Sequence, residues 1–508
     1  MAIPKAKERM IGTVLSYINT FLGMFITIFM VPMLLAACGE SEYSVYKVMS
    51  SMAAPMSMMN LGIAAYVSRA MAQCNQKNKL QNNSERQQIL GLSIVIGSVL
   101  CISAAVVAGC LYQQIPVIYA NTFTATELLL AQKLYVILAI NICVNIFGNG
   151  FQGCIAGNEK FIVAKVIALG KTILRAVCIV VIVLLDWGTM MVAACDMGLS
   201  ILVMGSEWLY VAFGLRERYR FDHFEKTEFK IFFTFALSML MQTVVNSINN
   251  SLDTVLLGAM VVDKTVITMY SSALTIYHAF ISISYTISGI FQPSIVRAVT
   301  AELPADQLLK KAVVPAKWQA IVSSAIILGF ILFGENFIAI WIGEKYIAAY
   351  YVALSLMIPS YLVSISGVYE AFLDAKLKRL VRSLILFGMA IGNAVVSFVL
   401  IQIIGYWGAA IGTVSSLVIG NLFVMNGYSA RVSGVPVLKL YKGAFSGIWK
   451  ALLLTLILCV PLSLFLPQTV EWFAVKIFIY MSVYFVAIVF VGEPDIGRYL
   501  LKRRQSAA

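Results

Sequence analysis

Long apolar segments, separated by short polar stretches, run along almost the whole chain. Each holds about 20 or more mostly apolar residues, the length that a helix needs to cross a bilayer core roughly 30 Å thick. A lipid-exposed segment must satisfy its own backbone hydrogen bonds, so each is predicted to be a helix and not a strand. The predicted fold class is an all-α polytopic membrane protein with about 14 transmembrane helices. The segments are 11–37, 44–68, 88–111, 127–151, 161–185, 188–213, 231–257, 266–295, 316–340, 348–372, 381–403, 407–430, 446–466 and 470–491.

The composition excludes the other broad classes of protein. Of the 508 residues, 60% are hydrophobic and 12% are charged, against roughly 25% charged in a soluble domain. The net charge is +13, but no polar stretch is long enough to form a basic domain that binds nucleic acid. The nine cysteines have no paired spacing, the two histidines lie far apart, and no GxxxxGK loop occurs. We therefore expect no disulfide framework, metal site, cofactor or ATPase activity.

The positive charges predict the orientation of the helices, because Lys and Arg concentrate in cytoplasmic loops. When the loops are taken alternately from the N-terminus, one set carries 29 of the 37 Lys and Arg residues. The other set carries two, Lys264 and Lys345, and the remaining six lie within the predicted spans. This asymmetry supports the number of spans and predicts that both termini are cytoplasmic.

Two parts of the chain resemble each other at an offset near 220 residues. Residues 186–188 match 406–408, and residues 62–70 match 289–298. With an even number of spans in each part, these matches predict two pseudo-symmetric six-helix lobes with a substrate path between them. The predicted divisions are an N-lobe over 1–214, a cytoplasmic linker over 215–230, a C-lobe over 231–431, and two further helices with a cytoplasmic tail over 432–508.

Short motifs in several predicted spans resemble those of a known family. Residues 39–46 (GESEYSVY) resemble its first outer turn, an acidic turn followed by Tyr-Gly-x-Tyr, with Ser44 in place of that glycine. The chain as a whole resembles the O-antigen and capsule repeat-unit flippases (Wzx-like) of the multidrug/oligosaccharidyl-lipid/polysaccharide exporter superfamily. The other matching segments are 60–63 with Arg69, 251–258, 340–343 and 408–412.

The resemblance implies a fourteen-helix, two-lobed transporter, not an enzyme, that works by alternating access. The implied substrate is an undecaprenyl-pyrophosphate-linked oligosaccharide, moved from the cytoplasmic to the outer leaflet of a bacterial inner membrane. Such transport serves the synthesis of surface polysaccharide: O-antigen of lipopolysaccharide, capsule or exopolysaccharide. The implied partners are the lipid-linked oligosaccharide, membrane lipids and other surface-glycan assembly proteins.

Other functions are weighed against this one. A multidrug exporter of the same superfamily is the nearest alternative, but cationic drugs favour acidic, aromatic lumens, and the predicted spans of the first half carry an excess of cations. A membrane glycan polymerase or ligase needs catalytic groups in a sizeable outer loop. The longest such loop, 112–126, contains no Asp, His, Lys or Arg. A passive scramblase or an interaction scaffold stays open.

Charges within the predicted spans are the first candidates for a substrate site, because each costs about 3 kcal/mol at the bilayer centre. The fifth span carries Lys165, Lys171 and Arg175, and the last two lie one turn apart on the same helix face. A pyrophosphate that crosses the bilayer needs such cations, which Arg supplies as a bidentate donor and Lys as a point charge. Lys171 is therefore the first candidate for binding the substrate phosphate.

A structural role for two of these cations stays open. The fifth and sixth spans form an antiparallel hairpin, in which Arg175 matches Asp196 in depth and Lys165 matches Glu207. Both pairs are therefore candidates for buried salt bridges. By the same depth count, Lys171 faces a hydrophobic residue, Ile201, and has no evident partner.

The other in-span lysines have two interpretations each. Lys47 and Lys133 begin the second and fourth spans near the outer surface. They either extend to the lipid headgroups or form an outward-facing release site for the pyrophosphate. Lys476, in the last span, is predicted to extend to the headgroups or to contact lipid.

Two polar stripes mark the second half of the chain. Asn246, Asn250 and Asp253 share one face of the seventh span, where they either bind sugar hydroxyls, a proton or sodium or join helices by hydrogen bonds. We assign the sugar contacts to the two amides and ion coupling to Asp253. His278 lies among hydroxyl side chains of the eighth span and is either a titratable substrate contact or a hydrogen-bonded residue of the cavity wall.

Overall fold

The computed structural model is helical, with no strand among the residues that it describes. Those residues are 5–60, 62–74, 79–221, 226–376 and 378–492. Contacts between Cα atoms divide the chain into two compact units, Met1–Thr268 (unit 1) and Met269–Ala508 (unit 2).

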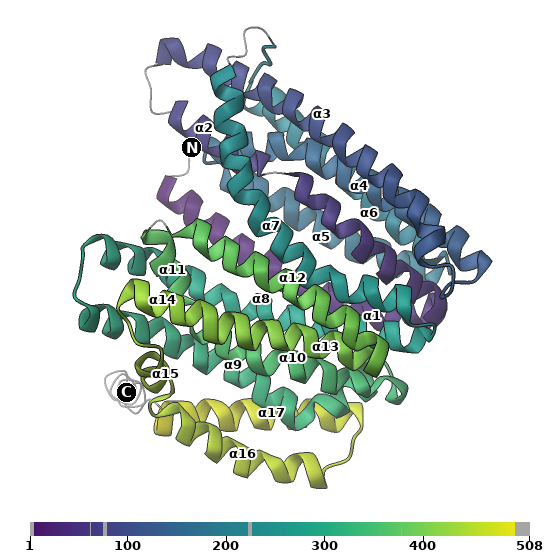
Figure 1. Cartoon of the computed structure of the whole chain (residues 1–508), viewed down its shortest axis with the longest axis vertical. Coiled ribbons are helices and arrows are strands. Elements are labelled where there is room, and N and C mark those ends of the chain that lie inside the picture. The colour runs from purple at the N-terminus through teal and green to yellow at the C-terminus, as the bar shows by residue number, and fades with distance from the viewer. Residues whose placement is uncertain (1–4, 61, 75–78, 222–225, 377, 493–508) are drawn as a thin grey trace, which may run out of the picture. The chain divides into compact units, whose positions relative to one another are not determined.

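Unit 1 is a bundle of long helices (Figure 1). In it, α4 packs against α2, α3 and α6, while α1 packs against α5, α6 and α7. The elements are α1 (Lys5–Ala53), the 3-10 helix η1 (Ala54–Asn60), α2 (Ile63–Cys74), α3 (Lys79–Ile118), α4 (Ala125–Gly157), α5 (Phe161–Leu184), α6 (Gly188–Leu209), the π-helix η2 (Tyr210–Gly214), α7 (Lys226–Met260) and the start of α8 (Lys264–Thr300).

Two interruptions divide the long first helix and the segment that follows it. Gly39 has φ 75° and ψ 172°, in a region that glycine adopts without steric cost, and it separates the first two predicted spans. Further along, the α-helix gives way to η1 at Ala54, next to Pro55. Proline lacks the N–H donor and clashes with the preceding turn, which explains the change of helix type.

Glycines on α4 let it approach α2 closely. A Cβ added at Gly153 would lie 2.6 Å from the carbonyl oxygen of Ala64, and one at Gly157 would lie 2.8 Å from that of Ser68. Small residues four positions apart are a common means of bringing membrane helices together. The pair therefore fixes the spacing of α2 and α4 inside unit 1.

Unit 2 contains the remaining helices. Its buried apolar core is formed by residues of α8, α9, α10, α11, α15, α16 and α17. The elements are α9 (Ala305–Trp341), the 3-10 helix η3 (Glu344–Tyr346), α10 (Ala348–Ile365), α11 (Val368–Ala375), α12 (Arg379–Ile404), α13 (Tyr406–Ser415), the π-helix η4 (Ser416–Met425), α14 (Asn426–Ser433), α15 (Val437–Phe445), α16 (Ile448–Phe465), α17 (Val470–Ala487) and the π-helix η5 (Ile488–Gly492).

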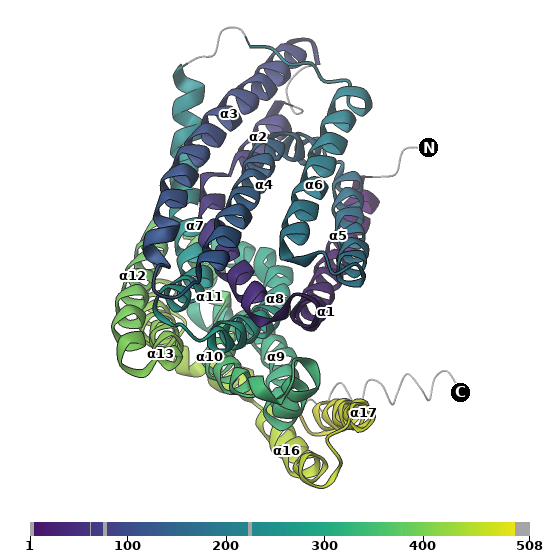
Figure 2. The same ribbon diagram turned by 90° about the vertical axis from the view of Figure 1, so that its right-hand side faces the viewer.

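The last two long helices, α16 and α17, lie side by side and pack against α9 (Figure 2). Hydroxyl groups on α17 join it to the backbone of α9: Tyr480 donates to the carbonyl of Ala325 at 2.6 Å, and Tyr484 to that of Ile321 at 2.5 Å. Buried tyrosines pack their rings and satisfy their hydroxyls at such places. The predicted two-helix appendage is therefore fastened to α9 of unit 2.

The structure confirms the predicted fold class. Among the described residues, 12 helices are long and apolar enough to cross a membrane. One of them, the 61-residue segment Val14–Cys74, covers two predicted spans. The predicted span 231–257 lies in the 35-residue helix α7, which is not among the twelve. Among the described residues, the fourteen predicted spans thus lie mainly on helices, and the predicted lobe divisions stay a prediction.

Candidate functional site

Arg175 and Asp196 form a bidentate ion pair between α5 and α6. The Nε atom of Arg175 donates to Oδ1 of Asp196 at 2.7 Å, and Nη2 donates to Oδ2 at 3.1 Å. Their side chains are 26% and 18% exposed. Paired N–H donors of this kind fix the orientation of the guanidinium group as well as its charge. The predicted Arg175–Asp196 salt bridge is therefore confirmed, and the carboxylate holds the arginine in place.

Lys171 is hydrogen-bonded, contrary to the sequence-based expectation. Its Nζ donates to Oγ of Ser200 at 3.0 Å, and the amide of Asn145 donates to the same hydroxyl at 3.3 Å. The prediction that Lys171 faces Ile201 and has no partner is wrong, because α6 presents the neighbouring residue. A lysine has three donors, and in the described part of the chain Lys171 uses one of them, on a neutral group.

The predicted salt bridge between Lys165 and Glu207 does not form in the part of unit 1 that is described. Glu207 is 5% exposed, and the cation close enough to interact with its charge is Lys171. Lys165 is half-buried on α5, nearer the start of that helix. The predicted Lys165–Glu207 pair is therefore wrong: the cation that interacts with Glu207 is Lys171, further along α5.

Lys47 joins these cations from α1. It is half-buried, its Nζ lies 5.4 Å from the centre of the Tyr43 ring, and its charge interacts with that of Arg175. Figure 2 shows α1, α5 and α6 next to one another in unit 1. We call Lys47, Lys171 and Arg175 the cation cluster. Sequence analysis selected all three residues but did not predict that Lys47 lies near the other two.

The cation cluster carries an excess of positive charge inside candidate membrane spans. Its three cations are accompanied by two carboxylates of α6, Asp196 and Glu207, whose charges both interact with Lys171. One positive charge is therefore left over in a region where an uncompensated charge costs about 3 kcal/mol. An anionic ligand that reaches the cluster would offset this cost and accept hydrogen bonds from the remaining donors.

The other candidate residues belong to other helices. Lys133 is exposed on α4. On α7, Asn250 is exposed and Asp253 is 3% exposed, while the side chain of Asn246 lies outside the described ones. His278 belongs to unit 2, where its ring centre lies 5.4 Å from that of Tyr277. Of the predicted site residues, the structure therefore brings together Lys47, Lys171 and Arg175.

Lys476 is buried rather than extended toward the headgroups. Its side chain is 1% exposed in the interface that α17 makes within unit 2, and among the described residues none pairs with its charge. The prediction that it contacts lipid or headgroups is wrong. A position near the end of an apolar helix favours snorkelling, but the packing of α17 decides which way this residue points.

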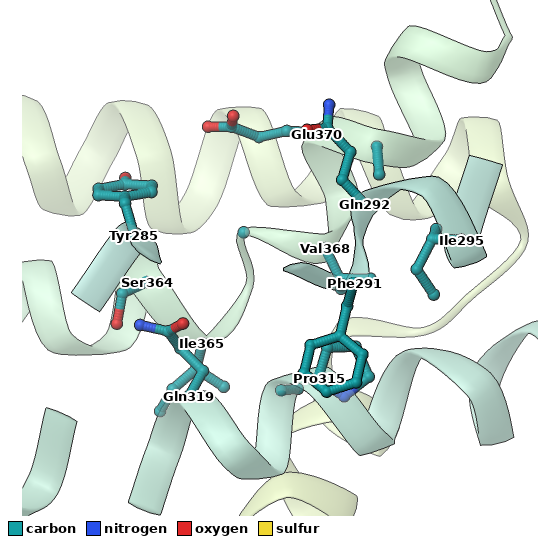
Figure 3. A pocket seen from close by; sticks show the side chains of 13 residues that line it. Tyr285, Phe291, Gln292, Ile295, Pro315, Gln319, Ser364, Ile365, Val368 and Glu370 are labelled. Atoms are coloured by element: carbon teal, nitrogen blue, oxygen red, sulfur yellow. The ribbon is translucent and has the colours of Figure 1, made fainter. Parts of the chain in front are cut away.

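Unit 2 contains a polar cavity that sequence analysis missed (Figure 3). Its volume is about 180 Å³, and its polar lining includes Tyr285, Gln292, Gln319, Ser364 and Glu370. These residues come from α8, α9, α10 and α11, so no single stretch of sequence signals the site. The cavity lies where α10 ends and α11 begins.

The fold is shared with solved structures of transporters. A lipid II flippase MurJ in an inward closed conformation matches with a TM-score of 0.71 and 15% identity, over 95% of this chain and 98% of that one. An inward-facing multidrug resistance MATE transporter of the MOP superfamily matches with a TM-score of 0.63 and 14% identity, over 81% of this chain and 95% of that one. A eukaryotic MATE transporter, AtDTX14, matches with a TM-score of 0.57 and 16% identity, over 87% of this chain and 98% of that one. The chain thus has the fold of MOP-superfamily transporters.

The family is shown by sequence. Residues 9–305 match the family described as polysaccharide biosynthesis protein, and the chain belongs to that family. No curated protein matches the chain. The family and the fold together confirm the superfamily assignment made from the short motifs of the sequence.

Proposed function

We propose that the protein is an alternating-access flippase for a lipid-linked oligosaccharide. Its substrate is an undecaprenyl-pyrophosphate-linked repeat unit, moved from the cytoplasmic to the outer leaflet for O-antigen, capsule or exopolysaccharide synthesis. The polysaccharide biosynthesis family and the fold shared with a lipid II flippase support this proposal. The observation that carries it is the excess of cations within the spans of unit 1.

The cation cluster fits the pyrophosphate part of such a substrate. Arg175 has five N–H donors, of which two hold Asp196, so part of its fork is available to a phosphate oxygen. Lys171 offers its remaining donors on the same helix face, and Lys47 adds a third charge from α1. We assign phosphate binding to these three residues, with Lys171 as the first contact.

Two further lysines extend the proposed path. Lys165 lies six residues before Lys171 on α5, a distance of roughly 9 Å along the helix axis. We propose that Lys165 attracts the phosphate as it approaches from the side predicted to be cytoplasmic. Lys133, exposed near the start of α4, is assigned with Lys47 to release on the outer side.

The test is a surface-glycan assay in a deletion strain that carries each variant on a plasmid. Lys171→Ala is expected to abolish surface glycan at unchanged protein level, and Lys171→Arg to retain part of it, because arginine keeps the charge. Lys439→Ala, at an exposed lysine of α15, is the matched control. Normal surface glycan in the Lys171→Ala strain would contradict the proposal, as would a deletion strain that accumulates no lipid-linked repeat units on the cytoplasmic face.

We assign the polar residues of the second half to sugar contact and ion coupling. Asn246, Asn250 and His278 are assigned to the glycan, and Asp253 to a coupling proton or sodium ion. The nearly complete burial of Asp253 (3% exposed) supports this role, because a buried carboxylate changes its charge state in response to its surroundings. Transport measured across a pH series in Asp253→Asn and His278→Ala tests it, and an unchanged profile in both variants would remove proton coupling.

The proposed location is a bacterial inner membrane, with both termini in the cytoplasm and with surface-glycan assembly proteins as partners. The 29 Lys and Arg residues of one loop set support this orientation through the positive-inside rule. Reporter fusions at the two termini test it. A fusion that is active only outside the cytoplasm at either end would overturn the orientation.

Multidrug export is the second candidate function, because MATE transporters share the fold. Cationic drugs would be repelled by the excess positive charge of the cation cluster. A drug-sensitivity assay beside the glycan assay separates the two functions. Flippase activity predicts that deletion changes surface glycan and leaves drug sensitivity unchanged.

A further inference from the structure

The cavity of unit 2 lies beside a break between two helices and a proline inside a third. Helix α10 ends at Ile365 and α11 begins at Val368, which leaves Gly367 in the lining. On helix α9, Pro315 lines the cavity. Because proline has no N–H, the backbone carbonyl one turn before it receives no helical hydrogen bond from that position.

The lining combines apolar and polar side chains and contains no cation. Among the thirteen residues that line the cavity there is no Lys or Arg. The amides of Gln292 and Gln319, the hydroxyls of Ser364 and Tyr285, and the ring of Phe291 face it from several sides (Figure 3). The cation cluster of unit 1 offers positive charge, whereas the lining of this cavity offers none.

The charged group of the lining is held in place from outside the cavity. Glu370 pairs with Nη2 of Arg382 at 2.7 Å, and the glutamate side chain remains 46% exposed. Next to it, the amide of Gln292 donates to the carboxylate of Asp374 at 3.4 Å. An oriented carboxylate and an oriented amide are therefore available side by side, and the arginine offsets the charge of the carboxylate.

These groups match a neutral ligand that is rich in hydroxyl groups. A side-chain amide donates and accepts hydrogen bonds in one plane, and a carboxylate accepts pairs of them. Both suit neighbouring hydroxyls, and an aromatic ring packs against an apolar face. A volume of about 180 Å³ exceeds the roughly 30 Å³ share of one liquid water by a factor of about six. The cavity therefore accommodates a single ring rather than one bridging water. A phosphate is disfavoured, because no cation lines the site.

The geometry points to a saccharide subsite in this cavity, which receives one sugar ring of the transported glycan. The cavity lies close to the ends of α8 and α9, where Arg297, Lys310 and Lys311 mark loops predicted to be cytoplasmic. A sugar ring would thus meet it on the side where the substrate is loaded. The inference rests on the proposed flippase function. It adds a second contact with the substrate, which binds the sugar rather than the phosphate.

The experiment measures sugar binding directly on the full-length protein in detergent. Saturation-transfer difference NMR is recorded with free glucose, galactose, mannose, N-acetylglucosamine, N-acetylgalactosamine and glucuronate, and with glycerol as a polyol that has no ring. Ala316→Leu fills the cavity without removing a polar group, and Gln292→Ala removes an amide at its exposed rim. Gln307→Ala, at an exposed glutamine of α9 outside the cavity, is the matched control. Each variant is used only if it elutes as the wild type does in size-exclusion chromatography.

We expect at least one sugar, and not glycerol, to give a signal that Ala316→Leu and Gln292→Ala lose and Gln307→Ala keeps. Lys171→Ala is expected to keep the signal, because Lys171 is assigned to the phosphate and not to the sugar. The subsite is overturned if no sugar binds to the wild type, or if Ala316→Leu leaves binding unchanged. Failure of the subsite alone leaves a protein that restores surface glycan but binds no free sugar. Failure of the proposed function instead gives a protein that binds sugar although its deletion strain makes normal glycan.

Discussion

Removing the carboxylate of Asp196 should leave the Arg175 guanidinium in unit 1 without its partner. Both hydrogen bonds of the pair, at 2.7 and 3.1 Å, would be lost. The side chains are 26% and 18% exposed, so the pair is partly buried. Breaking a buried pair costs about 3–5 kcal/mol, and a surface pair contributes about 0–1 kcal/mol. We expect Asp196→Ala to lose about 3 kcal/mol, near the lower end of the buried range.

The assay compares the thermal unfolding of purified variants in one detergent by fluorescence-detected size-exclusion chromatography. Asp306→Ala removes an exposed carboxylate at the start of α9 and serves as the control, expected within about 0.5 kcal/mol of the wild type. The double variant Arg175→Met, Asp196→Leu replaces the whole pair by apolar groups. It should recover most of the stability lost in Asp196→Ala, because no unpaired charge remains.

Two results would refute this reasoning. Equal unfolding temperatures for Asp196→Ala and Asp306→Ala would mean that the pair contributes no more than a surface carboxylate. A double variant that restores normal surface glycan would show that Arg175 has a structural role only and does not bind the substrate. The expected result is a stable double variant that makes no surface glycan.

Three further predictions concern stability, measured in the same unfolding assay. Gly153→Ala should destabilise by about 1–3 kcal/mol, since its Cβ would lie 2.6 Å from a backbone oxygen of α2. Gly109→Ala, with no atom within 4 Å of the added Cβ, should stabilise by up to about 1 kcal/mol; equal effects would contradict close packing. Lys264→Ala removes an ion pair to Glu127 at 3.3 Å and a ring contact at 3.9 Å and should cost about 1–2 kcal/mol, so an unchanged unfolding temperature would count against this contact. Lys476→Met should raise the unfolding temperature, because it removes a buried charge, and a lowered temperature would contradict this prediction.

The sequence alone determined the fold class and the candidate cations. Span length and the alternation of apolar and polar segments are local properties, set by the bilayer thickness and by the need to satisfy backbone hydrogen bonds. Pairing along the α5–α6 hairpin followed from counting residues to the turn, which correctly joined Arg175 to Asp196. The glycine at position 39 likewise marked the break between the first two spans.

The tertiary structure decided which way each helix turns its side chains. One residue along a helix changes direction by about 100°, so a depth count that selected Ile201 missed Ser200 as the partner of Lys171. The packing of α17 likewise buries Lys476. The cavity of unit 2 draws its lining from four consecutive helices, with residues between Tyr285 and Ala371. Rotation and spacing follow from how side chains pack between helices, and no single segment of sequence contains that information.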